Sequence, residues 1–396
     1  METTKNTIRH KSWPGIVWVP LFANGLMGEF VWPFISIILQ GNGLQEGRIG
    51  LVLGLGNLLP LLFRIPLAYL LDRIESPTRF MLLLFLLPLP ILLICFSSIH
   101  DALYGVIIAL LLWVGRLPYL PLSLALFNQK NTLPSSRKVL NSFVLVQHFI
   151  LGIVGLLAGA ALYFIGITQA LAGVGILTLV LNIWIVSTYI PAENRIPSGG
   201  TKRVPFLFPG KAEIWMLLAF FSFHFVNAPL LPFTELFLRG ITKNSSFIPL
   251  VSALAELTMV VMSLIYSRWL STLPISRVIL ASFLAQPLRL FALSHAHSPQ
   301  AILAIALLDG WGAGLFAMTS LIWARERARE NQVFNQFVGY IDLAVVLGGV
   351  LGSFTAGEMI SRWGFTGFAS RDIVLSLLPP FFLLFYHFFA RKESAI

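Results

Sequence analysis

Long apolar stretches recur along almost the whole chain, with only short polar joints between them. A helix needs about 20 consecutive apolar residues to cross the hydrocarbon core of a bilayer, which is about 30 Å thick. Only 11% of the 396 residues are charged, whereas a soluble domain carries about 25%. A water-soluble fold of this size could not cover its surface with so few charges. The sequence therefore predicts an all-α integral membrane protein.

We predict twelve transmembrane helices. They cover residues 13–39, 46–71, 79–98, 102–127, 139–166, 169–190, 212–238, 246–267, 277–295, 299–323, 334–360 and 372–390. The first apolar run is too long for the apolar part of a signal peptide, so we interpret it as a retained helix. We expect residues 1–190 and 212–396 to form two six-helix bundles, with residues 191–211 as a cytoplasmic linker.

The positive charges fix an orientation, because Lys and Arg favour loops on the cytoplasmic side. With both termini in the cytoplasm, 19 of the 27 Lys and Arg residues lie in cytoplasmic segments and 5 in outer loops. The remaining three, Arg64, Arg116 and Arg289, fall within helices. If the number of crossings were wrong by one, every later loop would change sides and this unequal distribution of charge would be lost. We expect a multi-pass protein of the plasma membrane, which in a bacterium is the inner membrane.

The two halves of the chain resemble one another. A shift of 199 residues places Pro33-Phe34 on Pro232-Phe233, and a shift of 194 places Asn141 on Asn335. Apolar low complexity is the alternative explanation, but two matches at nearly one shift, both across the linker, favour duplication. Parallel six-helix repeats around a midplane cavity are one of the main transporter architectures. We therefore expect the two bundles to be pseudo-symmetric.

The joint between the second and third predicted helices carries a motif. From Ala68 to Arg79 the sequence reads AYLLDRIESPTR, which resembles the major facilitator superfamily motif G-x-x-x-D-[RK]-x-G-x-[RK]-[RK]. Ala68 and Glu75 replace the two glycines, which alters the tight turn. The resemblance covers the whole length and implies that Asp72, Arg73 and Arg79 form a gating contact between the halves.

The fifth predicted helix narrows the resemblance. It carries Gly152, Gly155 and Gly159, similar to the glycine-rich motif of antiporters but without its proline. The subfamily that this pattern most resembles is the drug/proton antiporters. The pattern slightly favours export, and the missing proline leaves import open.

Ionisable residues within the apolar stretches are the candidates for substrate binding and proton coupling. A charged side chain near the bilayer centre costs about 2.5–3.5 kcal/mol on insertion scales, so its presence needs a reason. Glu29 lies in the middle of the first helix, which Pro33 can bend, and a buried carboxyl can exchange a proton as its solvation changes. The candidates are Glu29, Arg64, Arg116, His148, His224, Glu256, Asp309 and Asp342.

Each candidate also has a structural explanation. Arg64 and Arg116 could extend to the membrane surface, and the others could form hydrogen bonds between helices. Asp342 falls on His148 under the shift of 194, as a cavity shared by both halves would require. We interpret Glu235 and Glu358, near helix ends, as interfacial residues.

These features predict a secondary active transporter that moves a small solute by alternating access with proton coupling. A proton-coupled importer of the same fold is one alternative. An integral-membrane enzyme or a transporter-like sensor is an alternative of another class. We expect a small-molecule substrate, protons and the lipid bilayer as partners, no nucleic acid, no cofactor, no metal and a monomeric protein. The net charge of +10 is spread over short loops rather than gathered in a basic stripe.

The predicted topology can be tested by labelling single cysteines in a variant that lacks Cys95. A cysteine at Ser198 should react with a membrane-impermeant reagent only from the cytoplasm, and one at Lys243 only from outside. Reaction of both from the same side would contradict the twelve-helix topology.

Overall fold

A computed structural model gives the arrangement of the helices. It describes residues 22–23, 25–26, 31–71, 88–98, 100–115, 137–188, 208–242, 244–328 and 334–393. Throughout these ranges the regular secondary structure is helical. The elements are α2 (Trp32–Gly41), α3 (Glu46–Leu71), α5 (Pro88–Ser97), α6 (Ala102–Gly115), α8 (Arg137–Thr188), α9 (Lys211–Ile241), α10 (Phe247–Ile265), the π-helix η4 (Tyr266–Leu270), α11 (Ile275–Ser294), α12 (Pro299–Ala328), α13 (Phe334–Leu375) and α14 (Leu378–Glu393).

The helices follow the predicted spans closely. The predicted span 46–71 coincides with α3. The first residues of the predicted spans 212–238, 277–295 and 299–323 differ by at most two from the first residues of α9, α11 and α12. Six helices in the described ranges are long and apolar enough to cross a membrane, two of them long enough for two crossings each. Parts of the first, third and fourth predicted spans lie outside the described residues. The all-helical membrane fold is confirmed.

Two glycines divide the longest helices. In α8, Gly166 has φ 77° and separates the predicted spans 139–166 and 169–190. In α13, Gly364 has φ 68° and separates the predicted spans 334–360 and 372–390. Glycine adopts this conformation at little cost because it has no Cβ. The final predicted span was placed too late, at 372, because the helix restarts directly after Gly364.

These glycines also extend the internal repeat. They lie 198 residues apart, and each is followed after one apolar residue by threonine, in Gly166-Ile167-Thr168 and Gly364-Phe365-Thr366. The spacing falls between the shifts of 194 and 199 that align the halves. Equivalent turns thus reverse the chain in both halves.

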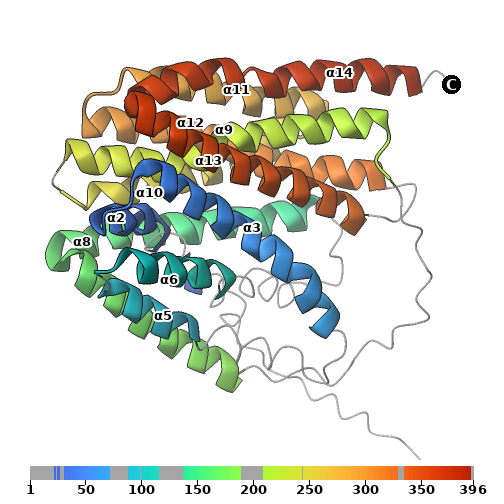
Figure 1. The fold of residues 1–396 in the computed structure, drawn as a ribbon. Helices are drawn as coiled ribbons and strands as arrows, with labels where there is room; N and C mark the ends of the chain where they lie inside the picture. Colours follow the sequence, from blue (N-terminus) through green and yellow to red (C-terminus); the bar gives the residue numbers. More distant parts are fainter. Residues whose placement is uncertain are drawn as a thin grey trace, which may run out of the picture.

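The two halves lie side by side in the bundle. Figure 1 places α2, α5, α6 and α8 (blue to green) on one side and α9, α11, α12 and α14 (yellow to red) on the other. Between them, α3 packs against α13 and α8 packs against α10. The repeat relates the second helix to the eighth and the fifth to the eleventh. The repeat that relates the two halves therefore also relates the α3–α13 contact to the α8–α10 contact.

Small residues let these helices approach closely. Gly50 on α3 faces Gly357 on α13, and a Cβ at Gly54 would lie 2.9 Å from the carbonyl oxygen of Val350. The Gly47 N–H donates to Ser361 Oγ at 2.9 Å. Close backbone approach of this kind is typical of helix contacts in membranes, where apolar side chains gain little by leaving lipid.

Three contacts between the halves gather at one end of the bundle, which we name the closed end. They join Gly47 to Ser361, Gly159 to the segment of α10 that begins near Ser246, and Ser36 to Pro232. Consecutive helices alternate in direction, so the end of α2, the start of α3 and the end of α9 all lie there. Ser36 Oγ donates to the Pro232 carbonyl at 3.4 Å, beside the residues that the repeat aligns.

A proline and a glycine fit α9 to α13. Pro229 lies inside α9 and has no N–H, so the carbonyl of Phe225 loses its helical partner. Gly352 of α13 packs directly on that carbonyl, and a Cβ there would lie 1.9 Å from the oxygen. The two features together hold the helices closer than any larger residue would permit.

We therefore predict that Gly352→Ala lowers the free energy of unfolding by about 1–3 kcal/mol, because the methyl group overpacks the contact. Gly339→Ala is the matched control on the same helix, since no described atom lies within 4 Å of its Cβ position. It should be neutral or stabilising by about 0.5–1 kcal/mol. Thermal unfolding in detergent measures both, and equal effects would contradict the packing described here.

Candidate functional site

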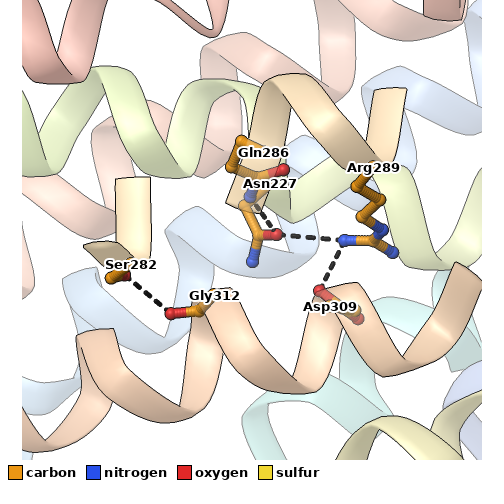
Figure 2. A network of polar contacts seen from close by, with 6 residues as sticks. All are labelled: Asn227, Ser282, Gln286, Arg289, Asp309 and Gly312. Carbon is orange, nitrogen blue, oxygen red and sulfur yellow. Dashed lines mark hydrogen bonds and ion pairs between the residues drawn. The ribbon is translucent and has the colours of Figure 1, made fainter. Parts of the chain in front are cut away.

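A cluster of polar side chains lies buried among the apolar helices of the second half. We name it the Arg289 cluster; it comprises Asn227 of α9, Gln286 and Arg289 of α11, and Asp309 of α12 (Figure 2). Arg289 Nη1 lies 2.5 Å from Asp309 Oδ1 and donates to Asn227 Oδ1 at 3.1 Å. Gln286 Nε2 donates to the same oxygen. Arg289 thus joins three helices, because it contacts both Asn227 of α9 and Asp309 of α12.

The sequence of α11 prepares this arrangement. Gln286 and Arg289 are three residues apart, so they share one face of the helix. On the same helix Ser282 Oγ donates to the Gly312 carbonyl of α12 at 2.7 Å, as Figure 2 shows. A Cβ at Gly312 would lie 3.1 Å from that of Ala285. The small residue thus holds α12 close enough for Asp309 to reach Arg289.

The cluster is nearly dry. The side chains of Arg289 and Asp309 are 3% and 7% exposed, so each charge has lost its water and depends on the other. An uncompensated buried charge costs several kcal/mol, and the Arg–Asp attraction offsets this cost only in good geometry. Either residue alone would be strongly unfavourable at this position.

Two buried polar atoms on α9 and α11 have no hydrogen-bond partner among the described residues. They are His224 Nε2 and Gln286 Oε1. The His224 ring lies edge-on to Phe316, with 4.8 Å between ring centroids. His224 and Asn227 are three residues apart on α9, so both lie on one face of that helix.

A second buried pair joins the two halves. His148 Nδ1 of α8 lies 2.5 Å from Glu256 Oε2 of α10, with side chains that are 12% and 15% exposed. The pair lies within the α8–α10 contact, flanked by Gly152 against Leu257. A charge on either residue is therefore tied to the relative position of the halves.

Glu235 differs from its sequence interpretation. We expected an interfacial residue because it lies near the end of α9, but it is 1% exposed. Its Oε1 accepts a hydrogen bond from Ser252 Oγ of α10 at 2.9 Å. The packing of α10 over this face covers the carboxyl, which position along the helix alone did not reveal. Glu358, by contrast, is 46% exposed and lies 3.9 Å from Arg362.

The structure places the sequence candidates unevenly. His148, His224, Glu256 and Asp309 lie in or near the buried polar groups described above. Asp342 is partly buried on α13, and Arg64 belongs to α3 with its side chain outside the described part. Outside the described residues lie Glu29, Asp72, Arg73, Arg79 and Arg116.

Sequence reasoning missed three members of the cluster, namely Asn227, Gln286 and Arg289. Arg289 was recognised as an arginine inside a helix but was not counted among the candidates. The cost of an intramembrane charge applies to it as much as to Asp309. The sequence does contain a signal for the pair, because Arg289 and Asp309 carry opposite charges inside two consecutive predicted helices.

A pocket of about 390 Å³ lies away from these charges. It opens at the closed end, between the two halves, and Gln40, Glu46, Phe237, Ser361 and Phe365 are among its lining residues. None of the buried ion pairs lines it. The buried ion pairs therefore lie outside this pocket.

Comparisons with known sequences gave no match, either to protein-family models or to curated proteins. Solved structures do match. The nucleoside transporter NupG has a TM-score of 0.71 at 13% identity, over 94% of this chain and 97% of its own. The human organic anion transporter MFSD10 (TETRAN) has a TM-score of 0.62 at 14% identity, over 93% and 98%.

A third match is a bacterial homologue of the human lysosomal transporter Spinster, in an inward-facing and occupied conformation. Its TM-score is 0.62 at 15% identity, over 95% of both chains. At such low identity these comparisons show a shared fold. The match extends over nearly the whole of each chain.

The buried pair gives a testable prediction. Arg289→Gln should lower the free energy of unfolding by about 3 kcal/mol, because Asp309 is left buried without its partner. The double variant Arg289→Gln/Asp309→Asn should recover most of this loss, since no charge remains. Unfolding of the four proteins of this double-mutant cycle in detergent measures the coupling. Simple additivity of the two single effects would contradict a direct ion pair.

Proposed function

Because the chain has the fold of major facilitator superfamily transporters, we propose that it is a proton-coupled secondary transporter of a small polar solute. Residues 1–190 and 212–396 would form the two bundles and residues 191–211 their linker. The bundles would rock against each other around a site in the membrane. Both termini would lie in the cytoplasm, which directs the closed end outward.

One observation carries the proton coupling, namely the presence of buried carboxyls whose partners lie on other helices. Glu256 is held by His148 across the two halves, and Asp309 is held by Arg289 within the second half. A carboxylate in a dry site stays ionised only beside a cation, and otherwise binds a proton. A movement that separates a pair therefore changes how many protons the protein holds.

The His148–Glu256 pair links this chemistry to the transport cycle. Its two helices belong to different halves, so rocking of the halves alters the distance or the surroundings of the pair. Proton binding to Glu256 would in turn weaken its hold on His148 and favour separation. This reciprocity is the general basis of coupling between two events on one protein.

The solute side of the site would use two buried polar atoms without a partner among the described residues, Gln286 Oε1 of the Arg289 cluster and His224 Nε2. Gln286 Oε1 can accept a hydrogen bond and His224 Nε2 can donate or accept one. Since Arg289 is already balanced by Asp309, we favour a neutral polar solute over an anion. NupG is a nucleoside transporter and MFSD10 an organic anion transporter. We therefore choose nucleosides and organic anions as the solutes to test.

The direction of transport stays open between export, which we slightly favoured, and import. The glycines that favoured export, Gly152 and Gly159, pack against Leu257 and Leu250 of α10. This packing serves an importer equally well. An enzyme of the membrane remains the alternative of another class, and a sensor would bind a solute without moving it.

The test uses purified protein in liposomes that contain a pH-sensitive dye. Addition of nucleosides or organic anions should produce a solute-dependent proton flux in the wild type. Glu256→Gln should abolish most of this proton flux, because the amide of glutamine cannot gain and lose a proton as a carboxyl does, while binding of the solute persists.

Glu358→Gln is the matched control, since this carboxyl is half exposed at the closed end, and its flux should equal that of the wild type. Solute binding without flux in the wild type would indicate a sensor. Equal proton flux in the Glu256→Gln variant would remove the coupling role of this residue.

A further inference from the structure

The pocket at the closed end lies apart from the charges that the proposed cycle uses. Its volume of about 390 Å³ falls within the range of about 300–1,000 Å³ that is typical of small-molecule sites. Such sites are mostly apolar and carry a few polar groups that orient the ligand. The lining of this pocket contains both kinds of group, with Phe233, Leu236 and Ile360 among the apolar residues and Gln40 and Glu46 among the polar ones. The pocket therefore has the size and the composition of a binding site.

The charge on the pocket wall is negative. Glu46 contributes a carboxylate, and among the described residues no lysine or arginine lines the pocket. Gln40 Nε2 donates to Glu46 Oε1 at 3.2 Å, but an amide is neutral and leaves the charge of the carboxylate in place. Arg239 precedes the lining residue Gly240, yet its Nη1 donates to Ser245 Oγ at 2.9 Å. A cation in the pocket would thus meet an opposite charge.

The helix ends around the pocket do not change this sign. At the pocket α2 ends at Gly41 and α9 ends at Ile241, whereas α3 begins at Glu46 and α13 resumes after Gly364. A helix carries about half a positive charge at its start and about half a negative charge at its end. Two starts and two ends offset one another, so the charge of Glu46 remains.

Aromatic rings form another part of the wall. Phe237 and Phe365 both line the pocket, and their rings stack with 4.5 Å between the centroids and 19° between the planes. The face of such a ring attracts a cation that lies within about 6 Å of its centroid. A carboxylate and aromatic rings in one pocket are the groups that recognise an organic ammonium ion.

The carboxylate and the rings belong to different halves of the protein. Glu46 begins α3 in the first half, whereas Phe237 of α9 and Phe365 of α13 belong to the second half. Ser361 also lines the pocket, and its Oγ accepts the hydrogen bond from the Gly47 N–H that joins the halves there. A ligand that contacts the carboxylate and the rings together therefore holds the two halves to each other at this end.

We propose that this pocket binds a monovalent organic cation, with an ammonium group on an aromatic or branched apolar body, and that the bound cation keeps the closed end shut. Glu46 pairs with the ammonium group, and Phe237 and Phe365 contact the body. The site itself stands on the pocket alone. Its effect on transport rests on the proposed function, in which the halves rock and this end opens. A ligand that binds one arrangement of the halves better than the other shifts the equilibrium toward that arrangement.

Binding is measured by equilibrium dialysis of radiolabelled benzyltrimethylammonium against the purified protein in a neutral detergent. Phenylacetate and benzyl alcohol carry the same ring with a negative charge and with no charge, and neither should displace the cation at the same concentration. Glu46→Gln should weaken binding at least about tenfold, because it removes the charge and keeps the shape. Phe237→Leu should weaken it about threefold or more, because the cation loses a ring face.

Glu358→Gln is the matched control for the loss of a carboxylate. Glu358 lies at the same end of the bundle and is not among the residues that line the pocket. This variant should bind benzyltrimethylammonium as the wild type does.

The effect on the closed end is measured by the labelling rate of Ser36→Cys in a variant that lacks Cys95. Ser36 is 0% exposed and donates to the Pro232 carbonyl across the halves, so a cysteine there reacts with a thiol reagent only when this end opens. At about ten times its Kd the cation should slow the reaction about tenfold, because the open population falls by the factor 1 + [L]/Kd. The rate should not respond to the same concentration of cation when Glu46→Gln is added to this variant.

Equal binding by the Glu46→Gln variant and the wild type would overturn the site, and so would displacement of the cation by benzyl alcohol. If a variant fails to fold, the competition series on the wild type still decides whether the pocket prefers a cation. Binding that leaves the labelling rate unchanged would overturn the effect on the closed end. Absence of labelling even without the cation would count against the rocking of the proposed function, and the dialysis would still decide the pocket.

Discussion

In the hydrocarbon of a bilayer no water can hydrogen-bond to a free N–H or C=O group, so the chain must satisfy its backbone internally. The rest of this structure depends on that constraint. Helices satisfy it locally, and the exceptions fall at two kinds of position. The carbonyl freed by Pro229 lies against Gly352, and the breaks at Gly166 and Gly364 fall at the turns between helices.

Helices that are already satisfied gain little from apolar contact, because lipid is as apolar as leucine. Their association therefore depends on close approach and on a few polar links. The glycines of α3 and α13 provide the first, and the Gly47–Ser361 and Ser36–Pro232 hydrogen bonds provide the second. These links lie at one end of the bundle. An interface made of small residues and few hydrogen bonds can separate at modest cost, as the rocking that we propose would require.

The same dry surroundings make every charge dependent on a partner. His148 pairs with Glu256 on a helix of the other half, and Arg289 pairs with Asp309 on the next helix along the chain. Their protonation is thus tied to the relative position of the helices. An interaction that would be weak in water is strong here, which is the basis on which we propose that proton binding is coupled to movement.

The sequence by itself determined the membrane class and the all-helical fold, and it predicted the spans and the duplication. Apolar length, charge in alternate loops and the match of Pro33-Phe34 to Pro232-Phe233 are properties of the chain read along its length. Glu256 and Asp309 were also found this way, because a charge inside an apolar stretch is conspicuous. The start of the last helix was misplaced, since a single glycine turn needs no polar loop.

The tertiary structure alone decided which charges meet. Nothing local distinguishes Arg289, which is buried in an ion pair, from an arginine that extends to the membrane surface. Glu235 lies near a helix end in the sequence, yet α10 covers it. Partner choice depends on how helices pack against one another, and the periodicity of the sequence does not record that packing.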